Sequence, residues 1–231
     1  MNRAVIFDLD GTLHDRDQSL YLFLQSQYDR LFANSSTFSM EQFLLDFIIL
    51  DKNGHVWKDV VYEKLVTKYS IFKYTSEELL NDYIMNFQAT CVVFNGTLEM
   101  LKELKEAGYK MGIITNGRLG FQRSIFHSLN LGPYFDDVII SEEVGLRKPD
   151  KEIFELSLQN LSVRANDAIY IGDHPFHDML AAKNVGLHTI WKENSNWGVA
   201  KADAVYQDMK ELSSLVSLLL VHKDKSDDVM G

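Results

Sequence analysis

The sequence predicts an α/β protein, built as a doubly wound, Rossmann-like parallel sheet with an all-helical domain inserted after its first strand. Short apolar runs alternate with amphipathic helical segments from residue 93 onward, which is typical of parallel βα units. Residues 16–92 show helical spacing without strand alternation. The composition, 46% hydrophobic and 24% charged, is that of a globular protein with a sizeable core.

The strands of the sheet are predicted from apolar runs that end in polar or loop-forming residues. Val5-Ile6-Phe7 stops at Asp8 and is soon followed by Gly11, which indicates a buried strand that runs into a loop. Comparable runs lie at residues 111–114, 138–140 and 169–171, with a weaker one at 188–191. Helices are expected between these runs, at residues 98–107, at 121–129 and after Pro149.

The inserted segment carries apolar stripes and helix-capping signals. Ser39 with Gln42, and Thr75 with Glu78, match the capping box that opens many helices. Its stripes are interpreted as core packing, and they contain Leu20, Phe23, Leu24, Tyr28, Leu31, Phe43, Leu44, Phe47, Ile48, Leu79, Leu80, Tyr83, Ile84 and Phe87. We therefore expect an α/β core from residues 1–15 and 93–231, a helical domain at 16–92 and a frayed tail at 223–231.

The charge balance limits the classes of partner. The chain has 23 basic and 33 acidic residues, a net charge of −10. Such a balance disfavours nucleic acid, which is held mainly by Lys and Arg, and also docking on anionic lipid. No stretch reaches the ~18 apolar residues of a membrane span. We expect a cytoplasmic protein whose partner is a small molecule, and the sequence does not indicate an oligomeric state.

Polar residues follow the predicted strands at the edge where ligands bind in doubly wound sheets, beyond the carboxyl ends of the strands. Taken in chain order, the residues that converge on this edge are Asp8 and Asp10, Thr115 and Asn116, Lys148, and Asp173 with Asp178. Each group alone has an ordinary structural explanation, such as a helix cap or a turn. Their occurrence together and in order favours a functional site.

These residue types suit phosphoryl transfer. Two carboxylates two residues apart, Asp8 and Asp10, can act separately as nucleophile and proton donor. Adding Asp173 and Asp178 gives an oxygen-rich site of the kind that Mg²⁺ prefers. A lysine and a threonine hydroxyl can then hold the phosphoryl group.

Four segments resemble the motifs of the haloacid dehalogenase superfamily in its phosphatase branch. They are Asp8-Leu9-Asp10-Gly11-Thr12, Ile114-Thr115-Asn116-Gly117, Lys148-Pro149, and Ile171-Gly172-Asp173 with Asp178. The resemblance covers the whole chain, and residues 16–92 are similar to the small helical cap of that family. The stretch 140–145 that leads to Lys148 resembles nucleotidase-like and phosphoglycolate-phosphatase-like members.

The resemblance implies a mechanism and the residues that perform it. Asp8 would attack phosphorus to form an aspartyl-phosphate, and Asp10 would protonate the leaving group and later activate water. Thr115, the Asn116 backbone and Lys148 would bind the oxygens of the transferred group. The implied function is Mg²⁺-dependent hydrolysis of a small phosphate monoester, such as a nucleoside monophosphate or a phosphoglycolate-like compound.

The same resemblance implies a metal site. Mg²⁺ would be held by Asp8, the backbone carbonyl of Asp10 and Asp173, with Asp178 in support. The chain departs from the usual pattern at His174 and His177, which stand where Ser or Thr and Asn are common. Because they share a predicted loop with hard oxygen ligands, we expect these histidines to lie at the surface or behind the ligands rather than to bind a transition metal.

Two alternatives bear on the reaction. Dehalogenases of the superfamily lack an acid at the position of Asp10, so its presence argues against them. A sugar-phosphate mutase, similar to β-phosphoglucomutase, keeps all four motifs and stays open. In the inserted domain, Trp57 and Lys58 are either leaving-group contacts or, respectively, a packed side chain and a solvated one.

Overall fold

The computed structural model describes residues 2–33 and 36–221, so the predicted frayed tail at 223–231 lies outside the described residues. The chain divides into two compact units. One consists of the described parts of Met1–Asp15 and Val93–Gly231, and the other of the described parts of Arg16–Val92.

The first unit is a layered α/β fold. Within residues 2–33 and 36–221, one parallel sheet has the strand order β3-β2-β1-β4-β5-β6. Its strands are β1 (Ala4–Phe7), β2 (Lys110–Thr115), β3 (Asp137–Ile140), β4 (Ala168–Gly172), β5 (His188–Lys192) and β6 (Ala204–Tyr206). The prediction of a doubly wound parallel sheet is confirmed. The β6 strand was not expected, because three residues at a sheet edge give no periodic signal.

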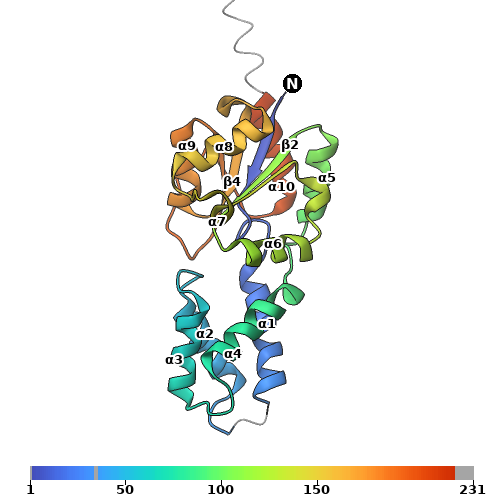
Figure 1. The fold of residues 1–231 in the computed structure, drawn as a ribbon. Helices are drawn as coiled ribbons and strands as arrows, with labels where there is room; N and C mark the ends of the chain where they lie inside the picture. The colour runs from blue at the N-terminus through green and yellow to red at the C-terminus, as the bar shows by residue number, and fades with distance from the viewer. Residues whose placement is uncertain (1, 34–35, 222–231) are drawn as a thin grey trace, which may run out of the picture. The chain divides into compact units, whose positions relative to one another are not determined.

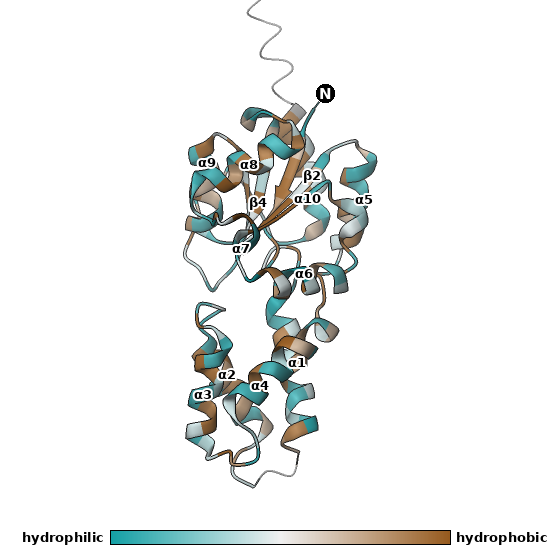
Figure 2. Cartoon of the chain, viewed as in Figure 1, coloured by the Kyte–Doolittle hydropathy of each residue, from teal (hydrophilic) through white to brown (hydrophobic). Residues whose placement is uncertain are grey.

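Helices cover both faces of this sheet. The unit contains α5 (Thr97–Glu106), α6 (Leu119–Ser128), η2 (Gly132–Tyr134), α7 (Ser141–Val144), α8 (Lys151–Leu161), η3 (Ala165–Asp167), η4 (Pro175–Leu180), α9 (Ala181–Val185) and α10 (Met209–Val221). Figure 1 shows α8 and α9 on one side of the sheet and α5 and α10 on the other. The strands between them carry largely hydrophobic side chains, coloured brown in Figure 2. The two layers of helices hold the sheet in place, and with it the edge that carries the motif residues.

The register of the central strands aligns their carboxyl ends. Phe7 of β1 pairs with Ile113 of β2 on one side and with Ile171 of β4 on the other. All four residues of β1 are buried. Because the strands are parallel and level, the loops that follow β1, β2 and β4 leave the sheet side by side.

The second unit is helical. It contains α1 (Arg16–Leu31), α2 (Met40–Asp51), α3 (Lys58–Tyr69), α4 (Ser76–Asn86) and the short η1 (Phe87–Thr90). Both predicted capping boxes are formed, at the start of α2 by Ser39 and at the start of α4 by Thr75. Most of the predicted stripe residues are buried, whereas Ile48 is 45% exposed, on a side of α2 where Leu45 and Ile49 are exposed as well. No helix in residues 2–33 and 36–221 is long and apolar enough to cross a membrane.

Trp57 and Lys58 make contacts inside the helical unit. The Trp57 ring packs edge-on against Tyr83, with 6.5 Å between centroids. Lys58 is only 3% exposed and pairs with Asp51, which also accepts a hydrogen bond from Arg16 at 2.6 Å. The expectation that Lys58 is otherwise solvated is therefore wrong, because the buried Asp51 carboxylate draws both cations inward. A leaving-group contact by Trp57 or Lys58 stays a prediction.

Candidate active site

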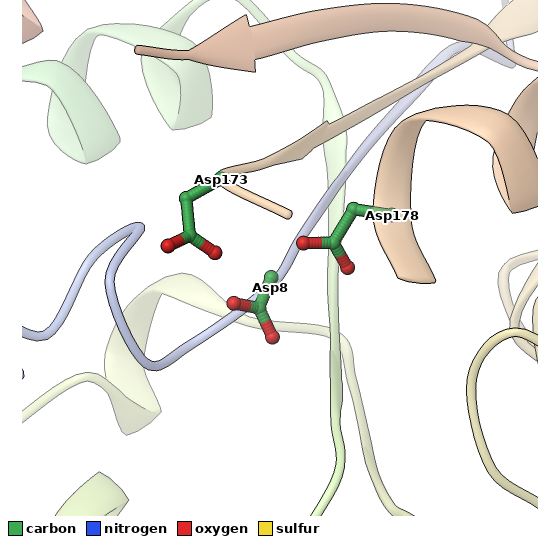
Figure 3. Close-up of side chains that lie close together, drawn as sticks. All are labelled: Asp8, Asp173 and Asp178. Carbon is green, nitrogen blue, oxygen red and sulfur yellow. The ribbon is translucent and has the colours of Figure 1, made fainter. Parts of the chain in front are cut away.

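Three predicted acids meet at the carboxyl edge of the sheet. Asp8 directly follows β1, Asp173 directly follows β4, and Asp178 lies in the π-helical turn η4 (Figure 3). One carboxylate oxygen from each of the three lies within 4.8 Å of those of the other two, and all three side chains are buried. The structure therefore gathers three of the four predicted metal-site residues into one cluster.

Two glycines make this convergence possible. Gly11 has φ +83°, and a Cβ there would lie 2.5 Å from Oδ2 of Asp173. A Cβ on Gly172 would lie 2.6 Å from the Cβ of Asp178. Real Cβ atoms do not approach other atoms so closely, and an L side chain would also strain the backbone at Gly11. The motif glycines thus keep space for the carboxylates.

Lys148 lies at the centre of the acids. Its Nζ donates to Oδ1 of Asp8 at 2.6 Å, to Oδ1 of Asp178 at 2.7 Å and to the hydroxyl of Tyr170 at 3.0 Å. The side chain of Asn116 fixes the lysine's backbone: it accepts from the Lys148 N–H and donates to the Lys148 carbonyl, both at 2.9 Å. The motif resemblance implies only a backbone role for Asn116, so this contact of its side chain with the lysine's backbone was not predicted.

Burial and the charges of neighbouring groups shift the pKa values of these residues. Burial raises the pKa of Asp8 well above its ordinary value, against the opposing charge of Lys148. Burial and then the Asp178 charge raise the pKa of Asp173 to about 6. Burial lowers the pKa of Lys148, but the carboxylates of Asp178 and Asp8 outweigh it and raise that pKa well above its ordinary value.

The donor set fits a divalent cation. Three buried carboxylates are grouped with one buried lysine, which pairs with two of them, so the cluster holds more negative than positive charge out of water. Such an excess is unfavourable unless a further cation neutralises it. All the anionic donors are hard oxygens, which suit Mg²⁺ better than a softer metal. The residues present therefore match the magnesium that the sequence predicts.

The remaining predicted residues, Asp10 and Thr115, are joined by Gln122 on α6. The Asp10 side chain is 30% exposed, and its Oδ1 lies 2.6 Å from Nδ1 of His14. Its Oδ2 accepts from Nε2 of Gln122 at 2.7 Å, and the same nitrogen lies 2.9 Å from Oγ1 of Thr115. The contact of Asp10 with the cluster that the sequence predicts, through its backbone carbonyl, stays a prediction.

Asp173 is held from a loop that the sequence analysis left unassigned. Its Oδ2 accepts from the side chain of Asn194 at 2.7 Å and from the indole of Trp197 at 2.9 Å. Trp191 donates to the Asp173 backbone carbonyl at 2.7 Å. Asn194 lies just after β5. It could have been predicted in the same way as the other site residues, as a polar residue that follows an apolar run, here the weaker run at 188–191. Tyr170 gives no such signal, because it lies inside a strand.

His174 and His177 stand next to the acids, and the backbone N–H of His174 donates to Oδ2 of Asp178 at 2.9 Å. The two rings stack with 4.2 Å between centroids, and Nδ1 of His174 accepts the backbone N–H groups of Phe176 and His177. Neither histidine belongs to the carboxylate cluster. The expected loop is in fact a π-helical turn, because His174 caps it and Pro175 needs no hydrogen-bond partner for its nitrogen.

Comparison with known proteins identifies the family. A family model described as haloacid dehalogenase-like hydrolase matches residues 5–192, which is most of the chain. The chain belongs to the haloacid dehalogenase-like hydrolases. The matched range includes the four motifs and the residues of the cluster. The predicted superfamily is confirmed.

Individual relatives are enzymes. The chain is 30% identical over 195 residues to a glyceraldehyde 3-phosphate phosphatase of Methanocaldococcus jannaschii, covering 82% of this chain and 84% of the relative. It is 30% identical to the pyrimidine 5'-nucleotidase YjjG of Escherichia coli, covering 94% and 98%. A solved structure of a phosphatase of this family from Thermococcus onnurineus matches with a TM-score of 0.65 and 28% identity, covering 93% and 97%. The predicted enzyme class, a phosphatase of this superfamily, is confirmed.

Proposed function

We propose that this chain hydrolyses phosphate monoesters of small metabolites through a phosphorylated Asp8. The observation that carries the proposal is the environment of the Asp8 carboxylate, which is buried, bonded to Lys148 at 2.6 Å and grouped with Asp173 and Asp178. A nucleophile held in this way needs little reorganisation when it attacks an anionic group, since the positive charge of Lys148 is already in place beside it.

The reaction has two in-line steps. In the first, an Asp8 oxygen forms a bond to phosphorus, the bond to the ester oxygen breaks, and the departing oxygen takes a proton from Asp10. In the second, Asp10 takes a proton from water, the water oxygen bonds to phosphorus, and the bond to Asp8 breaks. Inorganic phosphate leaves and the Asp8 carboxylate is restored.

The other residues bind charge and orient the phosphoryl group. Lys148, the Thr115 hydroxyl and the Asn116 backbone contact its non-bridging oxygens. Asp8, Asp173 and the Asp10 carbonyl would hold Mg²⁺, with Asp178 behind them, and the bound ion would supply neutralisation of the phosphoryl charge. The buried surplus of carboxylates supports this assignment.

The names of the relatives support the proposed substrate class. The two relatives named above act on glyceraldehyde 3-phosphate and on pyrimidine 5'-nucleotides. We take small phosphorylated metabolites of these kinds as the proposed substrates. The location proposed for the enzyme remains the cytoplasm expected from the sequence analysis.

A screen with purified protein tests the proposal. The protein is incubated with Mg²⁺ and a panel that includes glyceraldehyde 3-phosphate, pyrimidine nucleoside 5'-monophosphates, phosphoglycolate and hexose phosphates, and inorganic phosphate is measured. We expect release with at least one ester, and its loss in excess chelator. No phosphate release, with isomerisation of a hexose phosphate primed by a bisphosphate, would establish the mutase instead.

A further inference from the structure

Gln122 is a buried side chain between two motifs that the reaction uses. It lies in the first turn and a half of α6 and is 3% exposed. Its Nε2 contacts Oδ2 of Asp10 at 2.7 Å, Oγ1 of Thr115 at 2.9 Å and the Asn116 carbonyl at 3.2 Å. One nitrogen therefore touches the proposed proton donor and a proposed phosphate-binding hydroxyl.

The orientation of this amide follows from its neighbours. The Asn116 carbonyl is an acceptor only. Turning the amide over would place Oε1 against this carbonyl, so the N–H end must face the motifs. The other end is unsatisfied, because Oε1 is buried and has no hydrogen-bond partner among residues 2–33 and 36–221. A buried acceptor without a partner costs stability, and such sites call for a functional explanation.

The side chain of Gln122 also leaves no room for a Cβ at position 117, where the chain has glycine. A Cβ on Gly117 would lie 2.6 Å from Cγ of Gln122 and 2.9 Å from its Nε2. The glycine of the second motif therefore makes room for Gln122, not for the substrate alone. This close approach brings α6 to the loop after β2 and leaves the amide little freedom to move.

We infer that Gln122 is a positioning residue, which holds the Asp10 carboxyl beside the Thr115 hydroxyl so that one phosphate ester meets both. The ester oxygen that must be protonated and a non-bridging oxygen of the same phosphoryl group are neighbours on one phosphorus. The Asp10 carboxyl and the Thr115 hydroxyl, both hydrogen-bonded to one nitrogen of Gln122, can therefore meet these two oxygens together, the carboxyl at the ester oxygen and the hydroxyl at the non-bridging oxygen. The inference rests on the proposed function and adds a residue outside its motifs.

Leaving-group dependence separates this role from a structural one. Gln122→Met keeps the length of the side chain and removes its donors. It should lower kcat at least about tenfold for the best alkyl phosphate of the screen, a part of the ~10²–10⁴ that general acid–base help provides. For 4-nitrophenyl phosphate, whose leaving group needs no proton, the loss should stay below about threefold. Equal losses with both esters would overturn the inference.

A double-mutant cycle with Asp10→Asn gives a second readout. If Gln122 acts through Asp10, Gln122→Met should cost less than about threefold in the Asp10→Asn background, measured with the alkyl ester. If the fold-loss of the double variant equals the product of the two single losses, Gln122 does not act through Asp10. Gln122→Leu, which also lacks the amide donors and adds no charge, is expected to show the same pattern and serves if the methionine variant does not fold.

The matched control and the wild type complete the test. Gln159→Met makes the same change at an exposed position of α8 and should leave kcat for both esters unchanged. Wild-type protein that releases phosphate from no ester would remove the proposed function itself. If the wild type is active and the Gln122 variants have the same kcat for the alkyl ester, only the role of Gln122 is refuted.

Discussion

Replacing Lys148 by Met should destabilise the α/β unit strongly when no divalent ion is bound. The lysine is 3% exposed and is bonded to Asp8 and Asp178, at 2.6 and 2.7 Å. Methionine keeps much of the stem and removes the charge, so two buried carboxylates lose their counter-ion. Removing one partner of a buried ion pair typically costs ~3–5 kcal/mol.

That loss converts to a measurable shift in melting temperature. For a chain of 231 residues, 1 kcal/mol corresponds to about 2–4 °C, so the expected fall in Tm is roughly 6–20 °C. Thermal unfolding is followed by circular dichroism at pH 7, in excess chelator and again in millimolar Mg²⁺. The ion should recover part of the loss, because binding only to the folded state stabilises it.

Lys151→Met is the matched control. Lys151 begins α8 three residues further on and makes an exposed pair with Glu155 at 3.2 Å. Such pairs are worth only ~0.3–0.5 kcal/mol, so Tm should fall by no more than about 2 °C. A Lys148→Met protein that melts within about 2 °C of the wild type in chelator would refute the idea that this lysine neutralises the buried acids.

Two further predictions address the support of the metal site and the helical unit. Asn194→Ala removes one donor to Asp173 and should weaken Mg²⁺ binding about 10–100-fold by isothermal titration calorimetry; unchanged affinity would show that Asn194 does not orient this ligand. Burial raises the pKa of Asp51, but the charges of Arg16 and Lys58 more than offset it, so its pKa lies below the ordinary value. Its stabilisation is therefore present above about pH 4 and is lost as the pH falls through the lowered pKa, so the stability difference between wild type and Asp51→Asn should shrink below about pH 4 in urea titrations. A difference that is constant from pH 7 to about pH 3 would contradict this sign.

The sheet and much of the cluster could be predicted because both depend on local signals. Apolar runs mark the buried strands, and the residues after those runs stand at the binding edge of a parallel sheet. Asp8, Asp173 and Lys148 were located in this way, and the structure brings them together. The sequence also carries the glycines that give the carboxylates room.

The surrounding residues could not be predicted in the same way. Tyr170 points to Lys148 from within β4, where a pattern of apolar residues does not reveal a hydroxyl contact. Gln122 reaches Asp10 from a helix 112 positions away in sequence, a pairing that only the tertiary structure sets. Trp197 lies in the loop after β5, with no periodic signal to mark it. Long-range packing, not local preference, places these side chains.

Detection of phosphate on Asp8 tests the central claim most directly. Wild-type, Asp10→Asn and Asp8→Asn proteins are mixed in Mg²⁺ with 4-nitrophenyl phosphate, whose leaving group needs no proton, then quenched in acid, digested and examined by peptide mass spectrometry. We expect phosphate on the peptide that contains Asp8, at higher occupancy in Asp10→Asn because water loses its base, and none in Asp8→Asn, whose kcat should fall below about a hundredth of the wild-type value. A wild-type enzyme that turns over with no phosphorylated Asp8 in either protein, and an Asp8→Asn variant that keeps more than that fraction of kcat, would contradict the account.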